Sequence, residues 1–413
     1  MASEEIEIIE WSNGLTLLVE PMRHVQSAAF SILVPAGTLY EPEGQNGTSA
    51  ALCDLLTRGA GTLDSRQFAG ALDQSGVQRS ESVGWNFLTF SGATIADRIY
   101  EVLPLYADLL RRPHLPAEQF PAVMSGVEQT LLAEEDEPQR KVFTELRRAC
   151  YDSPWNRPSD GTLDELPSLT HDSVCAFYQQ SVQPQGALIG VAGNVDLARL
   201  RQVIEACFAD WKPGTPAVPG RKSTATSGRH ISHASTQTQI GIAFPAVPYG
   251  HEDYYAAWAA VSILSGGSSS RLFTEVREKR GLCYSVYATL HSLLTEGRVL
   301  AYAGATTDRA QETLDVMVAE MRRLSQGIEP QELARCLARA KSSLIMQQES
   351  TGARAGALAR DWFHLRRINT LHEIRAALER LTIEQILAYV EAFPARPLTV
   401  LTIGEESLRI PQD

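Results

Sequence analysis

The chain has 413 residues, of which 44% are hydrophobic and 21% charged, a composition typical of globular proteins with a sizeable core. This length exceeds what one ordinary core accommodates, so about two to four domains are expected. The formal net charge of −12 argues against nucleic acid or an anionic membrane surface as the main partner. Basic peptides would suit this charge, although solubility is its simplest explanation.

The sequence contains no targeting or membrane-spanning pattern. No apolar run approaches the length of a membrane span. The first ten residues are acidic and lack the apolar segment of a signal peptide, which predicts a cytoplasmic protein, or a periplasmic one if a leader was removed. The six cysteines are scattered without a Cys-x-x-Cys pair, so in a reducing compartment they are expected to be small buried hydrophobes.

In chain order, the first predicted elements are strands at 6–9, 15–19 and 28–34, with Asn13-Gly14 as the hairpin turn between the first two. A helix follows Gly47 and ends at Gly59. Helices and strands then alternate as far as a stretch rich in Pro, Gly, Ser and Thr, which predicts a linker at 213–229. The second half opens with a strand at 239–244.

The two halves repeat one another. Ser91-Gly-Ala-Thr before one helix matches Ala303-Gly-Ala-Thr before another, with Gly92 and Gly304 separated by 212 residues. The segments that begin at Leu169 and Leu381 match at the same offset, and each is followed by an apolar strand that ends in glycine. Three matches in the same order predict a tandem duplication, with one domain at 1–212 and the other at 230–413.

The predicted fold class is therefore α+β, with two homologous α/β sandwich domains. Antiparallel hairpins accompany the alternating helices and strands in each half, so each is expected to place helices on one face of a mixed sheet.

Residues 268–288 place a cation and a phenol seven positions apart. A serine run supplies N-cap oxygens, and apolar residues at helical spacing then predict an amphipathic helix that stops at Gly281. Arg277 is expected in the last turn of this helix, and Tyr284 on the strand that follows. The alternative is structural: a favourable charge at a helix C-terminus and a half-buried strand residue.

A two-fold repeat of this size with an Arg-x6-Tyr element in its second half resembles the pitrilysin or insulinase-type zinc peptidases, in particular the mitochondrial processing peptidase-like and small bacterial members. The resemblance covers essentially the whole chain. It implies that Arg277 and Tyr284 line a catalytic chamber, where they contact the substrate backbone and polarise the scissile carbonyl.

The family's zinc site is an inverted His-x-x-Glu-His on a helix, with a glutamate ligand about 76 residues later. Alignment on Gly47 and Gly59 places Ala50 at the first histidine, Cys53 at the general base and Asp54 at the second histidine, and Thr130 at the distant ligand. None of these substitutions preserves the chemistry. Among the four residues only Asp54 could bind the metal, and a single carboxylate does not hold zinc. The chain is thus expected to carry no cofactor and not to hydrolyse peptides on its own.

Other candidate sites are weaker. Cys53 with Asp54 could belong to a different metal site, or Cys53 could be a nucleophile, but the sequence offers no third ligand and no nearby histidine. His230-x-x-His233 has a metal-ligand spacing only on a helix, and this segment is predicted to be extended. The Gly- and Ser-rich stretch at 264–270 lacks the Lys-Ser/Thr ending of a phosphate loop.

The leading hypothesis is a non-catalytic subunit of a heterodimeric zinc metallopeptidase. Its partner would be a homologous chain with His-x-x-Glu-His and zinc, and the substrate a peptide or an unfolded polypeptide. Two alternatives remain open: an inert structural protein, like the family members that are scaffolds in respiratory complexes, and a homodimeric pseudoenzyme that binds peptides without cutting them.

Overall fold

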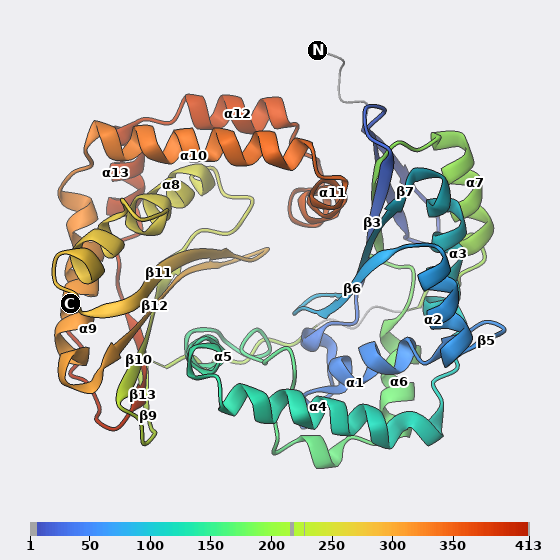
Figure 1. The fold of residues 1–413 in the computed structure, drawn as a ribbon, viewed down its shortest axis with the longest axis horizontal. Coiled ribbons are helices and arrows are strands. Elements are labelled where there is room, and N and C mark those ends of the chain that lie inside the picture. Colours follow the sequence, from blue (N-terminus) through green and yellow to red (C-terminus); the bar gives the residue numbers. More distant parts are fainter. Residues whose placement is uncertain (1–5, 215–218, 227, 412–413) are drawn as a thin grey trace. The chain divides into compact units, whose positions relative to one another are not determined.

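The computed structural model describes residues 6–214, 219–226 and 228–411 (Figure 1). Its contacts divide the chain into two compact units. Unit 1 comprises Met1–Ala133, Arg157–Arg221 and Met346–Phe363, and unit 2 comprises Glu134–Asn156, Lys222–Ile345 and His364–Asp413. Each unit thus includes a segment from the other half of the chain. The boundaries predicted at 212 and 230 concern the sequence repeat and stay a prediction; within the predicted linker, residues 215–218 and 227 lie outside the described residues.

Unit 1 is built on a mixed six-stranded sheet with the order β1-β2-β8-β3-β7-β6, in which only β2 and β8 pair in parallel. Its strands are β1 Glu7–Glu10, β2 Thr16–Pro21, β3 Ser27–Val34, β6 Gln78–Val83, β7 Leu88–Ile95 and β8 Leu188–Gly193, and β4 Gly59–Ala60 and β5 Leu63–Asp64 form a separate hairpin. Its helices are α1 Thr48–Leu56, α2 Ser65–Gln74, α3 Ile99–Arg111, α4 Phe120–Glu135, α6 His171–Ser181, α7 Leu197–Phe208 and α11 Thr351–Leu365, of which α4 and α11 end just inside unit 2.

Unit 2 has a five-stranded sheet with the order β11-β12-β10-β13-β9, in which only β13 and β9 pair in parallel. Its strands are β9 Gly228–Ser232, β10 Gln237–Ala246, β11 Cys283–Ser292, β12 Gly297–Thr306 and β13 Thr399–Gly404. Its helices are α5 Pro138–Cys150, α8 Tyr254–Ser265, the π-helix η5 Phe273–Glu278, α9 Ala310–Arg323, α10 Pro330–Gln348, α12 Leu371–Glu379 and α13 Ile383–Ala392, of which α10 ends just inside unit 1.

The two sheets confirm the predicted duplication. Strands β2-β8-β3-β7-β6 of unit 1 correspond in order to β9-β13-β10-β12-β11 of unit 2, and in both sheets the parallel pair lies at the same position. The two repeated Gly-Ala-Thr motifs occupy equivalent places, at the ends of β7 and β12 before α3 and α9. The edge strands β6 and β11 are therefore equivalents.

Side-chain alternation along the strands separates the two faces of each sheet. In β3, Phe30 and Ile32 belong to the main core of unit 1, which also contains apolar residues of α1, α3, α6 and α7. The intervening Ala29 belongs to a small cluster on the opposite face, together with Ala192 and Ala355 of α11. The sheet of unit 1 is thus covered on its second face by a helix from the C-terminal half of the sequence.

Unit 2 has the reciprocal arrangement. Ile240 and Ile242 of β10 face the main core, whereas a side chain at Gly241 would meet Val142 and Leu146 of α5. The prediction of helices on one face only was therefore incomplete. Small residues at particular positions allow a helix to lie close to the second face. A Cβ at Gly190 of β8 would lie 2.2 Å from the Ala355 carbonyl oxygen, so only glycine allows α11 to approach this closely.

A buried ion pair fixes α11 to the sheet of unit 1. Arg354 donates from Nε to Glu20 Oε2 at 2.8 Å, and its Nη2 lies 2.6 Å from the same oxygen. Glu20 lies on β2, and both side chains are more than nine-tenths buried.

Within the described ranges, no helix has both the length and the apolarity required to cross a bilayer.

Candidate functional site

Helix α1 carries three of the four positions that correspond to the zinc site. Ala50 packs against an apolar cluster that includes Val127 and Leu131 of α4. Cys53 is part of the main core of unit 1. Asp54 is half-exposed, and both of its carboxylate oxygens accept hydrogen bonds from Arg58 one turn later, at 2.9 and 3.1 Å.

The fourth position, Thr130, is exposed on α4. Its hydroxyl donates to the carbonyl oxygen of Gly126 one turn earlier, at 3.0 Å. A Cβ at Gly126 would come within 3.9 Å of Asp54 Oδ2, so the structure brings α1 and this part of α4 together as the alignment requires. The positions are therefore neighbours, but their side chains are not ligands.

These residues do not fit a zinc ion. Zinc in proteins takes at least three nitrogen, sulfur or carboxylate ligands in tetrahedral geometry. Ala50 supplies none, Thr130 is committed to the backbone, and the carboxylate of Asp54 is committed to Arg58. Across the part of the chain that the structure describes, no three His, Cys, Asp or Glu side chains cluster in a way that could hold a metal ion.

Cys53 is equally unsuited to be a nucleophile. Burial, followed by the nearby carboxylates of Glu81 and Asp54, raises the pKa of its thiol to about 12. A reactive cysteine needs the opposite environment, with a cationic neighbour and solvent access that favour the thiolate. The alternative roles considered for Cys53 therefore have no support in its surroundings, which are those of a core residue.

Arg277 lies in the last turn of η5, as predicted, but this helix is a π-helix. The Lys279 amide donates to the Thr274 carbonyl five residues earlier, and Gly281, with φ +58°, ends the segment. Single π-turns are frequent at functional sites because they redirect side chains. Here the π-turn includes both Phe273 and Arg277, and the guanidinium of Arg277 lies over the ring of Phe273.

The guanidinium of Arg277 contacts two aromatic rings. Its Cζ lies 4.7 Å from the ring centroid of Phe273 and 4.7 Å from that of Tyr284, within the range of cation–π attraction. Among the residues that the structure describes, none accepts a hydrogen bond from this guanidinium or pairs with its charge. Arg277 is thus held in place by the two rings while its N–H donors remain uncommitted.

Tyr284 lies on β11, as predicted, and its side chain is 83% exposed. The pairing of β11 with β12 shifts between Cys283 and Ser285, so Tyr284 is the extra residue of a β-bulge. A bulge changes the direction of the side chain that it carries. This explains why Tyr284, two residues after buried Leu282, faces solvent and contacts Arg277.

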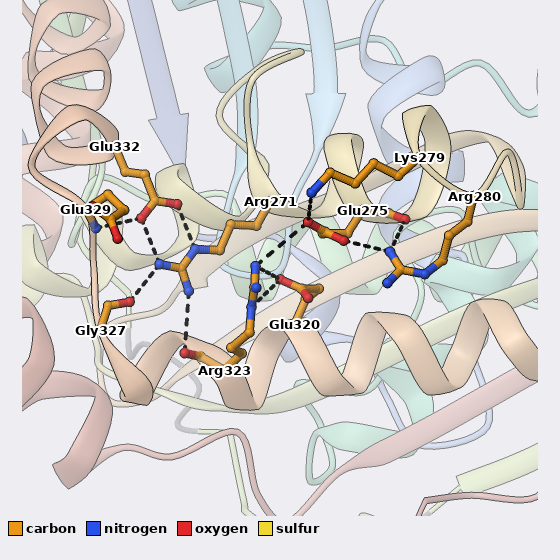
Figure 2. Close-up of polar contacts among 9 residues, drawn as sticks. All are labelled: Arg271, Glu275, Lys279, Arg280, Glu320, Arg323, Gly327, Glu329 and Glu332. Carbon is orange, nitrogen blue, oxygen red and sulfur yellow. Dashed lines mark hydrogen bonds and ion pairs between the residues drawn. The ribbon is translucent and has the colours of Figure 1, made fainter.

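Ion pairs hold η5 against its neighbours in unit 2 (Figure 2). At its start, Arg271 donates to both carboxylate oxygens of Glu332 and to the Gly327 carbonyl, each at 2.7 Å. Glu275 accepts from Lys279 and Arg280 at 2.6 Å, and these two hydrogen bonds, in that order, hold its pKa below the usual value. All the other basic side chains from 271 to 280 are therefore paired, and Arg277 is not.

Another sequence candidate, the pair His230 and His233, does not form a metal site. His230 lies on β9, where its Nδ1 is 2.8 Å from the Thr402 hydroxyl, and the extended segment separates it from His233, as predicted. Sequence reasoning missed the stacking of Arg277 on Phe273 and the pairing of Arg271 with Glu332. The position of Phe273, four residues before Arg277 on a helix, was the available signal for the first.

Together, a duplicated α+β fold, an Arg–Tyr pair in the second repeat and altered metal positions in the first define a peptidase-like protein without a catalytic zinc motif. Two family models match the chain: Insulinase (Peptidase family M16) at residues 17–161 and Peptidase M16 inactive domain at 168–340. The chain belongs to this family of insulinase-type peptidases and lacks its catalytic motif.

Similar proteins extend over nearly the whole chain. An uncharacterized zinc protease of Rickettsia felis is 23% identical over 98% of this chain and 99% of its own length, and YmxG of Bacillus subtilis, also an uncharacterized zinc protease, is 26% identical over 91% and 92%. A peptidase M16 inactive domain from Pseudomonas fluorescens has the same fold, with a TM-score of 0.89, 20% identity and coverage of 98% and 100%. A protease from Helicobacter pylori matches with a TM-score of 0.90, 19% identity and coverage of 97% and 99%.

Proposed function

We propose that this chain is a substrate-binding subunit of a two-chain zinc peptidase, and that it supplies Arg277 and Tyr284 to a homologous partner with His-x-x-Glu-His and zinc. The observation that carries the proposal is the contrast between the two sites. The donors of Arg277 are uncommitted and Tyr284 is exposed, whereas the metal positions lack a ligand set. A protein without a ligand at this site would not need an arginine that is fixed by two aromatic rings and has no hydrogen-bond acceptor among the described residues.

The chemistry of the pair supports a role at a peptide carbonyl. A guanidinium and a phenol are hydrogen-bond donors, and donors aimed at a carbonyl oxygen stabilise the negative charge that develops when water attacks. The cation–π contacts on both rings reduce the freedom of the long Arg277 side chain before the substrate binds. The metal-bound water would come from the partner, and no step is assigned to the altered positions of this chain.

An exposed sheet edge in unit 1 supports peptide binding. Strand β6 is an edge strand, packs beside α1 and has mostly exposed side chains. Edge strands bind extended peptides by main-chain hydrogen bonds, a mode that tolerates many sequences. Unfolded polypeptides are thus the substrate class that this surface favours.

Purification of the tagged chain alone and with its co-purifying partner tests the proposal. We expect less than about 0.1 zinc per isolated chain by mass spectrometry and no cleavage of fluorogenic peptides, whereas the complex contains zinc and cleaves them. Stoichiometric zinc and cleavage by the isolated chain would overturn the proposal.

A structural role is the second candidate. One chain of Complex III2 from Candida albicans shares this fold, with a TM-score of 0.82, 18% identity and coverage of 97% and 96%. Titration calorimetry with an unfolded peptide separates the two functions. A substrate-binding subunit binds the peptide and loses affinity in Arg277→Ala, whereas a scaffold shows no binding that depends on Arg277.

A further inference from the structure

A pocket lies in unit 2, and Arg277 is not among the residues that line it. Its volume is about 300 Å³, and it opens between the end of α8, the loop Gly266–Ser270 and one face of α10. Ile263 and Cys336 are buried at its apolar floor, and the polar wall comprises Ser268, Ser269, Ser270, Glu332, Arg335 and Arg339.

The charges of this pocket are not balanced. Arg335 and Arg339 lie one helical turn apart, and neither has a hydrogen bond or an ion pair with another described residue. The only carboxylate of the pocket, Glu332, has both oxygens engaged by Arg271 and also accepts from the Glu329 amide (Figure 2). Two like charges one helical turn apart repel one another, and an anion bound between them would relieve this repulsion.

The loop opposite supplies further donors. Arg339 lies close over Gly267, because a Cβ at this glycine would be 3.2 Å from its Nη1. The glycine therefore brings the backbone of the loop near the guanidinium, and three consecutive serine hydroxyls continue the wall. Serine hydroxyls and arginines are the usual donors for the oxygens of a phosphate group.

From this geometry we infer that the pocket binds a phosphate monoester. Such a group carries about 1.5 to 2 negative charges at neutral pH and three acceptor oxygens, which match the serine wall and the two arginines without an ion pair among the described residues. Glu332 is the one carboxylate of the lining; Arg335 interacts with it electrostatically, but both of its oxygens hydrogen-bond to Arg271. The volume exceeds that of a bare phosphate, so the ligand carries a further small group on its ester oxygen.

Titration calorimetry of the full chain tests this site with inorganic phosphate, O-phosphoserine, a phosphoserine peptide and malonate. We expect saturable binding of O-phosphoserine, with at least tenfold loss in Arg335→Ala and in Arg339→Ala, since each variant removes a charge-assisted hydrogen-bond donor to the phosphate. Lys341→Ala is the matched control: it removes one positive charge from the same helix outside the pocket and leaves affinity unchanged.

The titrations with the other compounds identify the kind of ligand. A phosphoserine peptide that binds at least tenfold more tightly than O-phosphoserine would assign the phosphate to a peptide, and equal or weaker binding to a free small molecule. Absence of saturable phosphate binding up to about 20 mM, malonate binding as tight as that of O-phosphoserine, or an equal loss in Lys341→Ala would overturn the inference. None of these measurements depends on a peptidase partner, so the inference and the proposed function can fail separately.

Discussion

Replacement of Arg271 by alanine tests whether the ion pairs of Figure 2 hold η5 in place. The side chains of Arg271 and Glu332 are only 9% and 14% exposed, and the arginine makes three hydrogen bonds of 2.7 Å. Removal of one partner from such a pair leaves a buried charge and typically costs about 3–5 kcal/mol. The Glu329 amide continues to stabilise Glu332, so we expect a loss of about 3 kcal/mol.

Urea unfolding followed by circular dichroism measures this loss, and hydrogen exchange locates it in η5 and the start of α10. Arg98→Ala is the matched control, because its ion pair with Glu101 is about half exposed on both sides and contributes less than about 1 kcal/mol. Addition of Glu332→Gln to Arg271→Ala should recover part of the loss, since it removes the unpaired charge. The reasoning is wrong if Arg271→Ala and Arg98→Ala destabilise the protein equally.

Three further outcomes follow from the packing and the pKa shifts. Gly190→Val should destabilise unit 1 by more than about 3 kcal/mol in urea unfolding, because its Cβ would overlap the Ala355 carbonyl, whereas Gly70→Ala, in open space on α2, should be neutral or stabilising. Burial, followed by the nearby charge of Arg147, lowers the pKa of His291 to about 4, well below the ordinary value of 6.5. As the pH falls, His291 is therefore protonated in the unfolded chain before it is protonated in the folded one, and the free energy of unfolding should fall by about 1–3 kcal/mol between pH 6.5 and pH 4. A His291→Gln variant whose free energy of unfolding depends on pH as it does in the unmodified protein would contradict this. Cys53 should resist a thiol reagent at pH 7 in the native protein and react after unfolding, and rapid native labelling, mapped by mass spectrometry, would refute its placement in the core.

The sequence predicted those features that depend on local pattern or on repetition. The offset of 212 residues led to two sheets with equivalent strand orders, and the turn at Gly281 separated the helix of Arg277 from the strand of Tyr284. Both depend on residues close in sequence or on matches between the two halves, which one sequence is enough to reveal.

The exchange of α5 and α11 between the two units could not be predicted in this way. The surfaces that receive these helices include Ala29, Gly190, Ala192 and Gly241, and these small residues give no apolar signal. Similarly, a π-turn and a one-residue bulge leave no trace in composition, and Arg271 lies 61 residues from Glu332. These features arise from tertiary packing, and the π-turn and the bulge decide how Arg277 and Tyr284 are presented.

The most direct test of the proposed function is the peptidase activity of the purified two-chain complex with variants of this chain. Arg277→Ala and Tyr284→Phe should each lower kcat/KM by at least tenfold, the effect of losing a transition-state donor, without change in zinc content or assembly. Arg375→Ala removes an exposed charge elsewhere in unit 2 and should leave activity unchanged. If complexes with Arg277→Ala and Tyr284→Phe cleave peptides as fast as the unmodified complex, these residues do not act on the substrate, and the proposed role is wrong.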